Sequence, residues 1–182
     1  MRWLILVGHL LILALPGSAL AGEDASSAVS EVKSAFVYNF IQFTRWPTTP
    51  EDSAKADLIL CVYARGAIAD ALSGLEGKPL EQRRIRVKVW PDTPRGCHVV
   101  YLATASEPRA LSILYAAQEA AALTIAEDYR TPAGDVDIGL FDDGDRLGFA
   151  VNLDTARKKG FKFSSKLLRL AKSVFPRPED EP

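Results

Sequence analysis

Ala-Asp-Leu-Ile-Leu-Cys-Val-Tyr, residues 56–63, is the stretch that decides the fold class. Its centre, residues 58–62, is apolar at every position, so apolar and polar residues do not alternate. Such a strand is buried on both faces, which is typical of a parallel sheet covered by helices on its two sides. Residues 99–102, Val-Val-Tyr-Leu, repeat the pattern further along the chain. These two runs predict the centre of an α/β sheet.

The remaining segments alternate between helical and extended patterns. We expect helices at residues 30–44, 66–74, 107–118 and 154–159, and a last one from Ser164 or Ser165 to Phe175. Strands are expected at residues 56–63, 84–89, 97–103, 121–125, 136–142 and 146–153, the last two joined as a hairpin through Asp143-Gly144. This order predicts a single α/β domain with a mixed sheet of about six strands, flanked by helices on both faces.

Aromatic side chains mark the first predicted helix. The stripe expected to be buried consists of Val32, Phe36, Phe40 and Phe43, which recur at helical spacing. Trp46-Pro47 should end the helix, because a residue before proline avoids helical conformations. Since one face must enter the core, Tyr38 and Trp46 are predicted to be exposed anchors for a partner.

The last predicted helix is amphipathic and contributes a second part of this surface. Its wide apolar stripe consists of Leu167, Leu168, Leu170, Ala171, Val174 and Phe175, and its other side is basic. Such a stripe is core in most proteins, although part of it can serve a dimer or a partner groove. Arg169, Lys172 and Phe175 therefore join Tyr38 and Trp46 as the candidate partner or dimer surface.

The N-terminal residues favour export. Arg2 precedes an apolar run at residues 3–15, and Ala19-Leu20-Ala21 has the small-residue pattern of a cleavage site. The run is shorter than the ~20 residues that a membrane span needs. We expect a signal peptide at residues 1–21, cleaved after Ala21, and a flexible segment at 22–30. The folded domain should occupy residues 31–175, followed by a disordered acidic proline-rich tail at 176–182.

Two cysteines, Cys61 and Cys97, follow the predicted signal peptide. Exported proteins seldom keep thiols unpaired, which favours a disulfide, and two buried free thiols are the alternative. Distance is the difficulty for a disulfide. If their strands are parallel neighbours, Cys61 in mid-strand and Cys97 at a strand start can lie beyond the ~7 Å that two bonded Cα atoms tolerate.

The sequence carries few signatures of chemistry. It lacks the G-x-S-x-G, H-E-x-x-H, Walker and G-x-G-x-x-G patterns, and His98 is the only histidine after the predicted signal peptide. Cys97 and His98 are poor partners for a reactive thiol, because adjacent strand residues point to opposite faces. The acidic run at residues 142–145 fits a hairpin turn better than a calcium loop. We predict no catalytic, cofactor or metal site, and a net charge of −1 gives no reason to expect nucleic acid.

Several blocks occur in an order that is specific as a set. They are KSAFVYNF at 33–40, Trp46-Pro47, LCV at 60–62, LEGK at 75–78, CHVVYL at 97–102, FAVN at 149–152 and SKLLRLA at 165–171. Together they resemble the YfiR family, over nearly the whole chain that follows the predicted signal peptide. Cys61 and Cys97 match a cysteine pair of that family, while a second pair found in some members has no counterpart here.

The resemblance implies a dimeric α/β protein of the periplasm that is not an enzyme. YfiR-like proteins repress a membrane-bound diguanylate cyclase of the YfiN type by engaging its periplasmic part, which controls cyclic di-GMP and biofilm formation. An outer-membrane lipoprotein can sequester the repressor, and a membrane sensor kinase is another partner to expect. The alternative function is an envelope small-molecule-binding protein that acts as a sensor subunit, with its pocket at a sheet edge.

Overall fold

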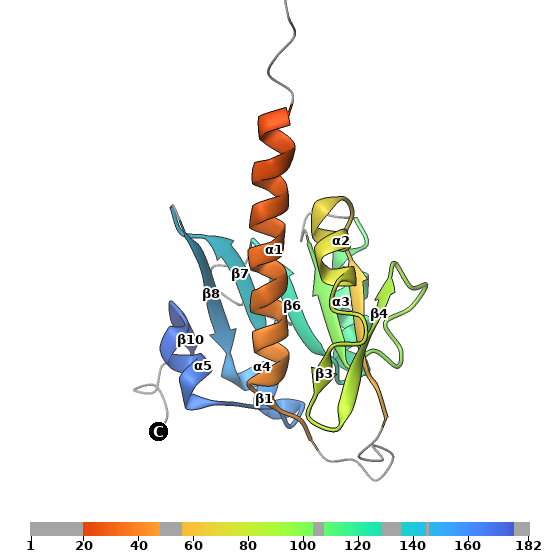
Figure 1. Ribbon diagram of the computed structural model, residues 1–182. Coiled ribbons are helices and arrows are strands. Elements are labelled where there is room, and N and C mark those ends of the chain that lie inside the picture. The colour runs from red at the N-terminus through yellow and green to blue at the C-terminus, as the bar shows by residue number, and fades with distance from the viewer. Residues whose placement is uncertain (1–19, 48–55, 104–107, 129–135, 145, 177–182) are drawn as a thin grey trace, which may run out of the picture.

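Strand β2 (Leu58–Tyr63) lies inside the sheet, as its uninterrupted apolar sequence predicts. It runs parallel to β4 (Arg83–Val89) on one side and to β5 (Val99–Leu102) on the other. These elements come from a computed structural model that describes residues 20–47, 56–103, 108–128, 136–144 and 146–176. Leu58, Leu60 and Val62 are fully buried, because both faces of β2 are covered (Figure 1).

In the described residues the main sheet has eight strands in the order β10-β8-β7-β6-β5-β2-β4-β3. The further strands are β3 (Pro79–Leu80), β6 (Leu123–Glu127), β7 (Ile138–Asp142), β8 (Leu147–Asn152) and β10 (Ser173–Phe175). Strands β7, β6, β5, β2 and β4 are parallel, whereas β8 runs antiparallel to β7 and β3 antiparallel to β4. A separate two-stranded sheet pairs β1 (Thr44–Arg45) with β9 (Lys162–Phe163).

The predicted mixed α/β architecture is confirmed, with eight strands in place of about six. All six predicted strands are present. The two additional ones, β3 and β10, have two and three residues, too few for an alternating pattern to appear in the sequence. Both lie at the edges of the sheet, where pairing to a neighbouring strand is enough to order them.

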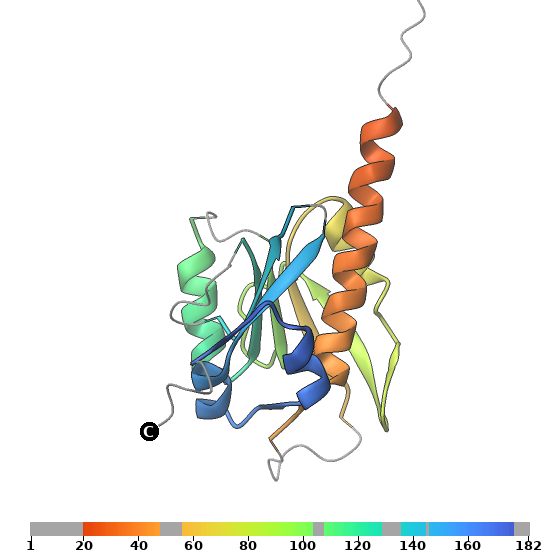
Figure 2. The same cartoon turned by 90° about the vertical axis from the view of Figure 1, so that its left-hand side faces the viewer.

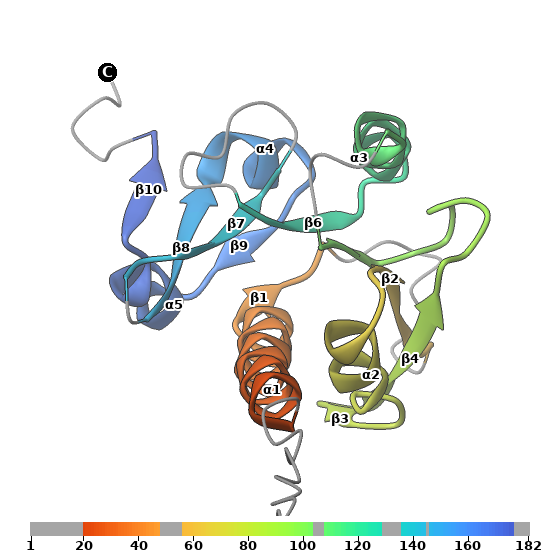
Figure 3. The ribbon, with the colours of Figure 1, turned by 90° about the horizontal axis from the view of Figure 1, so that it is seen from above.

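Helices cover both faces of the sheet, as predicted. They are α1 (Leu20–Gln42), α2 (Ala67–Ser73), α3 (Ala110–Glu119), α4 (Leu153–Lys158) and α5 (Ser165–Leu170). Helices α1 and α2 lie on one face and α3 on the other (Figure 2, Figure 3). Two core clusters result. One gathers Phe40, Leu72 and Tyr101 under α1 and α2, and the other gathers Cys61 and Ile113 under α3.

The buried stripe of α1 differs from the predicted one. Val32 is 48% exposed, whereas Ser34, Val37 and Ile41 are buried together with the predicted Phe40. The hydroxyl of Ser34 donates a hydrogen bond to the Ala71 carbonyl of α2 at 2.9 Å. A small residue lets the two helices approach closely, a requirement that hydrophobicity does not reveal. The helix also begins at Leu20, so residues 22–30, for which a flexible segment was expected, are helical here (Figure 1).

The prediction of one long C-terminal helix is wrong. Helix α5 ends at Leu170, and Ser173–Phe175 form β10, which pairs in parallel with β8. The side chain of Ser164 caps α5 as predicted, accepting from the Leu167 amide at 3.2 Å. The unpaired edge of β8 offers backbone hydrogen bonds, such as that from the Lys172 amide to the Phe149 carbonyl, and this tertiary pairing overrides the helical pattern. As a result Leu170 is 65% exposed.

A buried ion pair joins the sheet to the turn after α4. Asp137 is fully buried, and one of its carboxylate oxygens accepts from the Thr124 amide at 2.8 Å and from the Thr124 hydroxyl at 2.9 Å. The ammonium of Lys159 pairs with the same oxygen and donates to the Ala122 carbonyl at 2.9 Å. Removing one partner leaves a buried charge without its counterion.

We therefore expect the Lys159→Met variant to lose about 3 kcal/mol of unfolding free energy, because Asp137 stays buried without its cation. Urea denaturation at neutral pH measures the loss. Lys158→Met is the matched control, since Lys158 is exposed. Its effect should stay below about 0.5 kcal/mol. Equal losses in the two variants would show that the ion pair does not contribute to stability.

Candidate functional site

The connection between β4 and β5 must cross the central strand, because these two strands lie on opposite sides of β2 and all three are parallel. It begins where the Trp90 amide donates to the Val62 carbonyl and ends where the His98 amide donates to the Ile59 carbonyl, both at 2.9 Å. Parallel crossovers usually take a dozen or more residues and contain a helix. This one is short, and within it no helix forms.

A disulfide between Cys61 and Cys97 fastens the crossover to β2, which confirms the predicted pairing. Their Cα atoms are 5.8 Å apart, well within the range that a disulfide allows. The expected distance problem does not arise, because Cys97 precedes β5 and folds back over the face toward which Cys61 points. Both residues belong to the core cluster under α3.

Side chains hold both ends of the crossover in place. At its end, Nδ1 of His98 accepts from the Ile59 amide at 3.0 Å. At its start, Nε1 of Trp90 donates to the Ala64 carbonyl at 2.7 Å, and the ring packs edge-on against Tyr63. Burial raises the pKa of Tyr63, whose hydroxyl has no partner within the described part of the chain. The crossover is therefore held at both ends and by its bond to β2, and Cys97 is bonded to Cys61 instead of being a reactive thiol.

The exposed side of β4 carries a network of charges. Arg86 pairs with Asp57 at 2.7 Å and with Glu76 at 2.9 Å, and Glu76 also accepts from the Val87 amide at 2.7 Å. The Val87 hydrogen bond and then Arg86 lower the pKa of Glu76, and Arg86 lowers the pKa of Asp57. Because these groups face water, the network contributes little to stability and marks no site.

Tyr38 and Trp46, predicted as exposed anchors, are half-buried. The Tyr38 hydroxyl donates to the Pro79 carbonyl at 2.9 Å, and the Lys78 ammonium lies 5.4 Å from its ring centroid. Trp46 packs edge-on against Phe161, with ring centroids 5.3 Å apart. Internal contacts therefore fix both rings, and only part of each lies at the surface.

The other three predicted surface residues lie near the opposite edge of the sheet from β3 (Figure 1). Arg169 is exposed on α5, Lys172 pairs with Asp143 at 2.7 Å, and Phe175 is half-buried in β10. The structure thus separates the five predicted residues into three places: beside β3, at the end of α1, and along α5 and β10.

One of these places, around Trp46, is hollowed into a groove of about 840 Å³. The segment that follows α1, the turn between β3 and β4, and strand β9 form its walls. Its charged side chains are Arg45, Arg83, Lys162 and the acidic Glu81. We call it the basic groove, because cations outnumber acids among its charged lining residues.

Backbone pairing concentrates charge in the basic groove. Arg45 of β1 stands opposite Lys162 of β9 in the antiparallel register. Like charges directly opposite each other are destabilising unless an anion lies between them. This arrangement could not be predicted from the sequence, because strands of two residues leave no periodic signal and the paired residues are far apart along the chain.

The part of the chain that the structure describes was also searched for metal clusters and membrane-spanning helices. Among the described residues, no three His, Cys, Asp or Glu side chains are placed to hold a metal ion. No helix in this part of the chain combines the length and apolar character that a membrane span needs.

Breaking the Cys61–Cys97 bond should lower the unfolding free energy by about 4 kcal/mol in the chain-entropy treatment. The reason is that the unfolded chain regains the conformational entropy that a cross-link between residues 36 positions apart removes. Urea denaturation with and without reductant measures the loss in one preparation. The Cys61→Ala/Cys97→Ala variant should have the unfolding free energy of the reduced protein, and reductant should not change it. A loss under about 1 kcal/mol would show that the bond is dispensable.

We compared the chain with curated proteins and with protein-family models. Curated proteins give no match. The family model DUF4154, described as YfiR/HmsC-like, matches residues 30–172. The matched region runs from within α1 to the residue before β10 and includes both cysteines and the basic groove. Because the match covers most of the chain, this protein belongs to the YfiR/HmsC-like family.

Proposed function

We propose that this protein is a periplasmic repressor that binds the periplasmic part of a membrane-bound diguanylate cyclase and holds the enzyme inactive. The YfiR/HmsC-like family is a regulatory, non-catalytic family whose members are known as repressors of diguanylate cyclases. The family match over residues 30–172 is the observation that carries the proposal.

Repression of this kind depends on differential affinity. The repressor must bind the inactive cyclase more tightly than the active one, since equal affinity for both states shifts nothing. A tenfold drop in active enzyme requires at least about tenfold tighter binding to the inactive state. A rigid binding surface helps, because little conformational entropy is then lost on association.

The basic groove is the docking region that we propose for the cyclase. It presents Arg45, Arg83 and Lys162 around Trp46, which suits an acidic segment with an aromatic or aliphatic anchor. Arg169, Lys172 and Phe175 remain the predicted surface for a second contact, either a homodimer or a sequestering lipoprotein.

Charge reversal in the basic groove tests the docking region. In the organism that encodes the protein, deleting its gene should raise cyclic di-GMP, and the wild-type gene should restore the low level. The Arg45→Glu/Lys162→Glu variant should fail to restore it, because an acidic partner is repelled. Cyclic di-GMP in cell extracts is the measurement, with the amount of folded protein checked by immunoblot and circular dichroism.

The matched control is Arg84→Glu/Lys88→Glu, which reverses two exposed charges of β4 away from the groove and should repress normally. If deletion leaves cyclic di-GMP unchanged, the proposed function is wrong. If deletion raises it but the groove variant represses like the wild type, only the choice of docking region is wrong.

Export is part of the proposal. The disulfide supports an oxidising compartment, and residues 1–21 have the pattern of a cleavable signal peptide. Residues 1–19 lie outside the described part of the structure. Osmotic-shock fractionation should release the protein with the periplasm, and mass spectrometry should find Gly22 at its N-terminus. Recovery of the uncleaved chain from the cytosol would contradict this localisation.

A further inference from the structure

The connections that follow the neighbouring strands β2 and β5 lead toward opposite edges of the sheet. After β2 the chain passes through α2 and the short β3 to β4 on one side, whereas after β5 it passes through α3 to β6 on the other. The two helices lie on opposite faces of the sheet (Figure 3). In open α/β sheets such a switch point separates the loops at the carboxyl ends of the two strands and opens a crevice there, where ligands bind.

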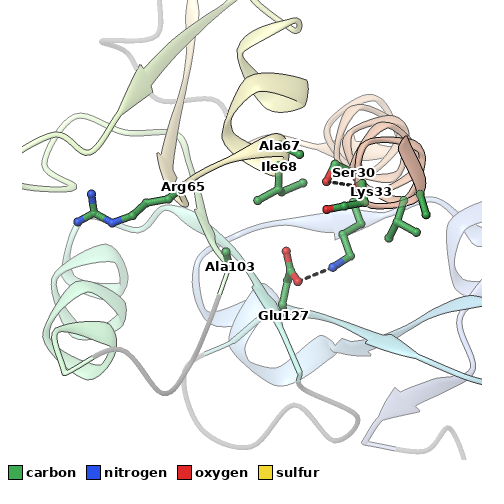
Figure 4. Close-up of a pocket in the computed structure, with 10 residues that line it drawn as sticks. Ser30, Lys33, Arg65, Ala67, Ile68, Ala103 and Glu127 are labelled. Carbon is green, nitrogen blue, oxygen red and sulfur yellow. Dashed lines mark hydrogen bonds and ion pairs between the residues drawn. The ribbon is translucent and has the colours of Figure 1, made fainter. Parts of the chain in front are cut away.

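A pocket of about 460 Å³ lies at this position. Arg65 and Ala67, which follow β2, and Ala103, which follows β5, form part of its wall. Helix α1 lines another side with Val29 and with Ser30, which is labelled in Figure 4. Its volume is within the range of small-molecule sites, and it is separate from the basic groove at the other end of α1.

An ion pair between α1 and β6 provides the polar part of the pocket. The Lys33 ammonium lies 2.5 Å from Glu127 (Figure 4). The other carboxylate oxygen of Glu127 accepts from the Tyr101 hydroxyl. Burial and then the Glu127 charge raise the pKa of Tyr101, so its phenol stays protonated and donates. Both oxygens of Glu127 thus have a donor. Lys33 has three N–H groups, and Glu127 is the one acceptor that its ammonium meets among the described residues.

The remaining walls are largely apolar: Ile68 and Ala103 face the space in Figure 4, and Val29 also lines it. The Arg65 guanidinium does not compete for a ligand, because it stacks 4.6 Å from the Trp90 ring centroid and points away from Lys33 (Figure 4). Glu127, next to Lys33, repels a doubly charged anion about twice as strongly as a singly charged one. A singly charged acceptor with an apolar body matches both parts of the pocket.

We propose that this pocket binds a small aliphatic carboxylate. The carboxylate accepts hydrogen bonds from the Lys33 ammonium, and the alkyl chain packs against Val29, Ile68 and Ala103. This site does not depend on the proposed repressor function, and the two can fail separately.

Hexanoate is the probe for this site, with hexylamine and hexanamide as controls of equal length. Titration calorimetry on the purified protein gives the Kd for hexanoate. At about ten times that Kd, hexanoate should raise the midpoint of thermal unfolding by about 4 °C, while hexylamine should not. The absence of hexanoate binding up to about 10 mM, or an equal shift with hexylamine, overturns the proposal.

Two variants locate the binding. Val29→Trp fills the pocket and should weaken hexanoate binding at least about tenfold. Its matched control is Val32→Trp, on the same helix, because Val29 and Val32 are 50% and 48% exposed and Val32 does not line the pocket. The control should bind like the wild type. Unchanged binding by Val29→Trp overturns the proposal.

Lys33→Gln keeps an amide donor for Glu127 and removes the positive charge. Hexanoate binding should weaken at least about tenfold, whereas hexanamide should have the same affinity for this variant as for the wild type. If Lys33→Gln does not fold, the comparison of Val29→Trp with Val32→Trp still decides the question.

Discussion

Burial of β2 on both faces is the constraint on which the rest of the structure depends. Two layers of helices are needed to cover it, and β4 and β5 must flank it. The chain then has to pass from one flank to the other over a buried face. The short crossover from Trp90 to His98 does this without a helix of its own, and the bond from Cys97 to Cys61 fastens it to β2. The disulfide is therefore part of the sheet architecture.

Two ion pairs differ in burial, and this difference separates a structural pair from the pair for which we propose a ligand. Asp137 and Lys159 lie inside the protein, with side-chain exposures of 0% and 9%, and strand and turn groups surround them. Lys33 and Glu127 are more open, at 17% and 13%, and border a pocket with apolar walls. The first pair joins segments of the fold, and the second retains donors that face the pocket.

Helix α1 connects the two hollows of the molecule. Its N-terminal half lines the pocket at the carboxyl ends of the parallel strands, and its last residue and the chain beyond it line the basic groove. The helix packs along its length, through Ser34 against α2 and through Phe40 against Phe149 of β8. One rigid element thus positions residues of both hollows relative to the sheet.

The sequence by itself determined the α/β class, the six main strands, the cysteine pair and the family resemblance. Local patterns, such as the apolar run at residues 58–62, or residue types at fixed positions predict these features. Tertiary structure alone decided the buried face of α1, the pairing of β10 and the opposition of Arg45 to Lys162. Each of these depends on a contact between segments far apart in the chain, where a small residue or an open strand edge outweighs local hydrophobicity and helix propensity. The pocket and the basic groove were likewise decided by tertiary structure, because residues from several elements line each of them.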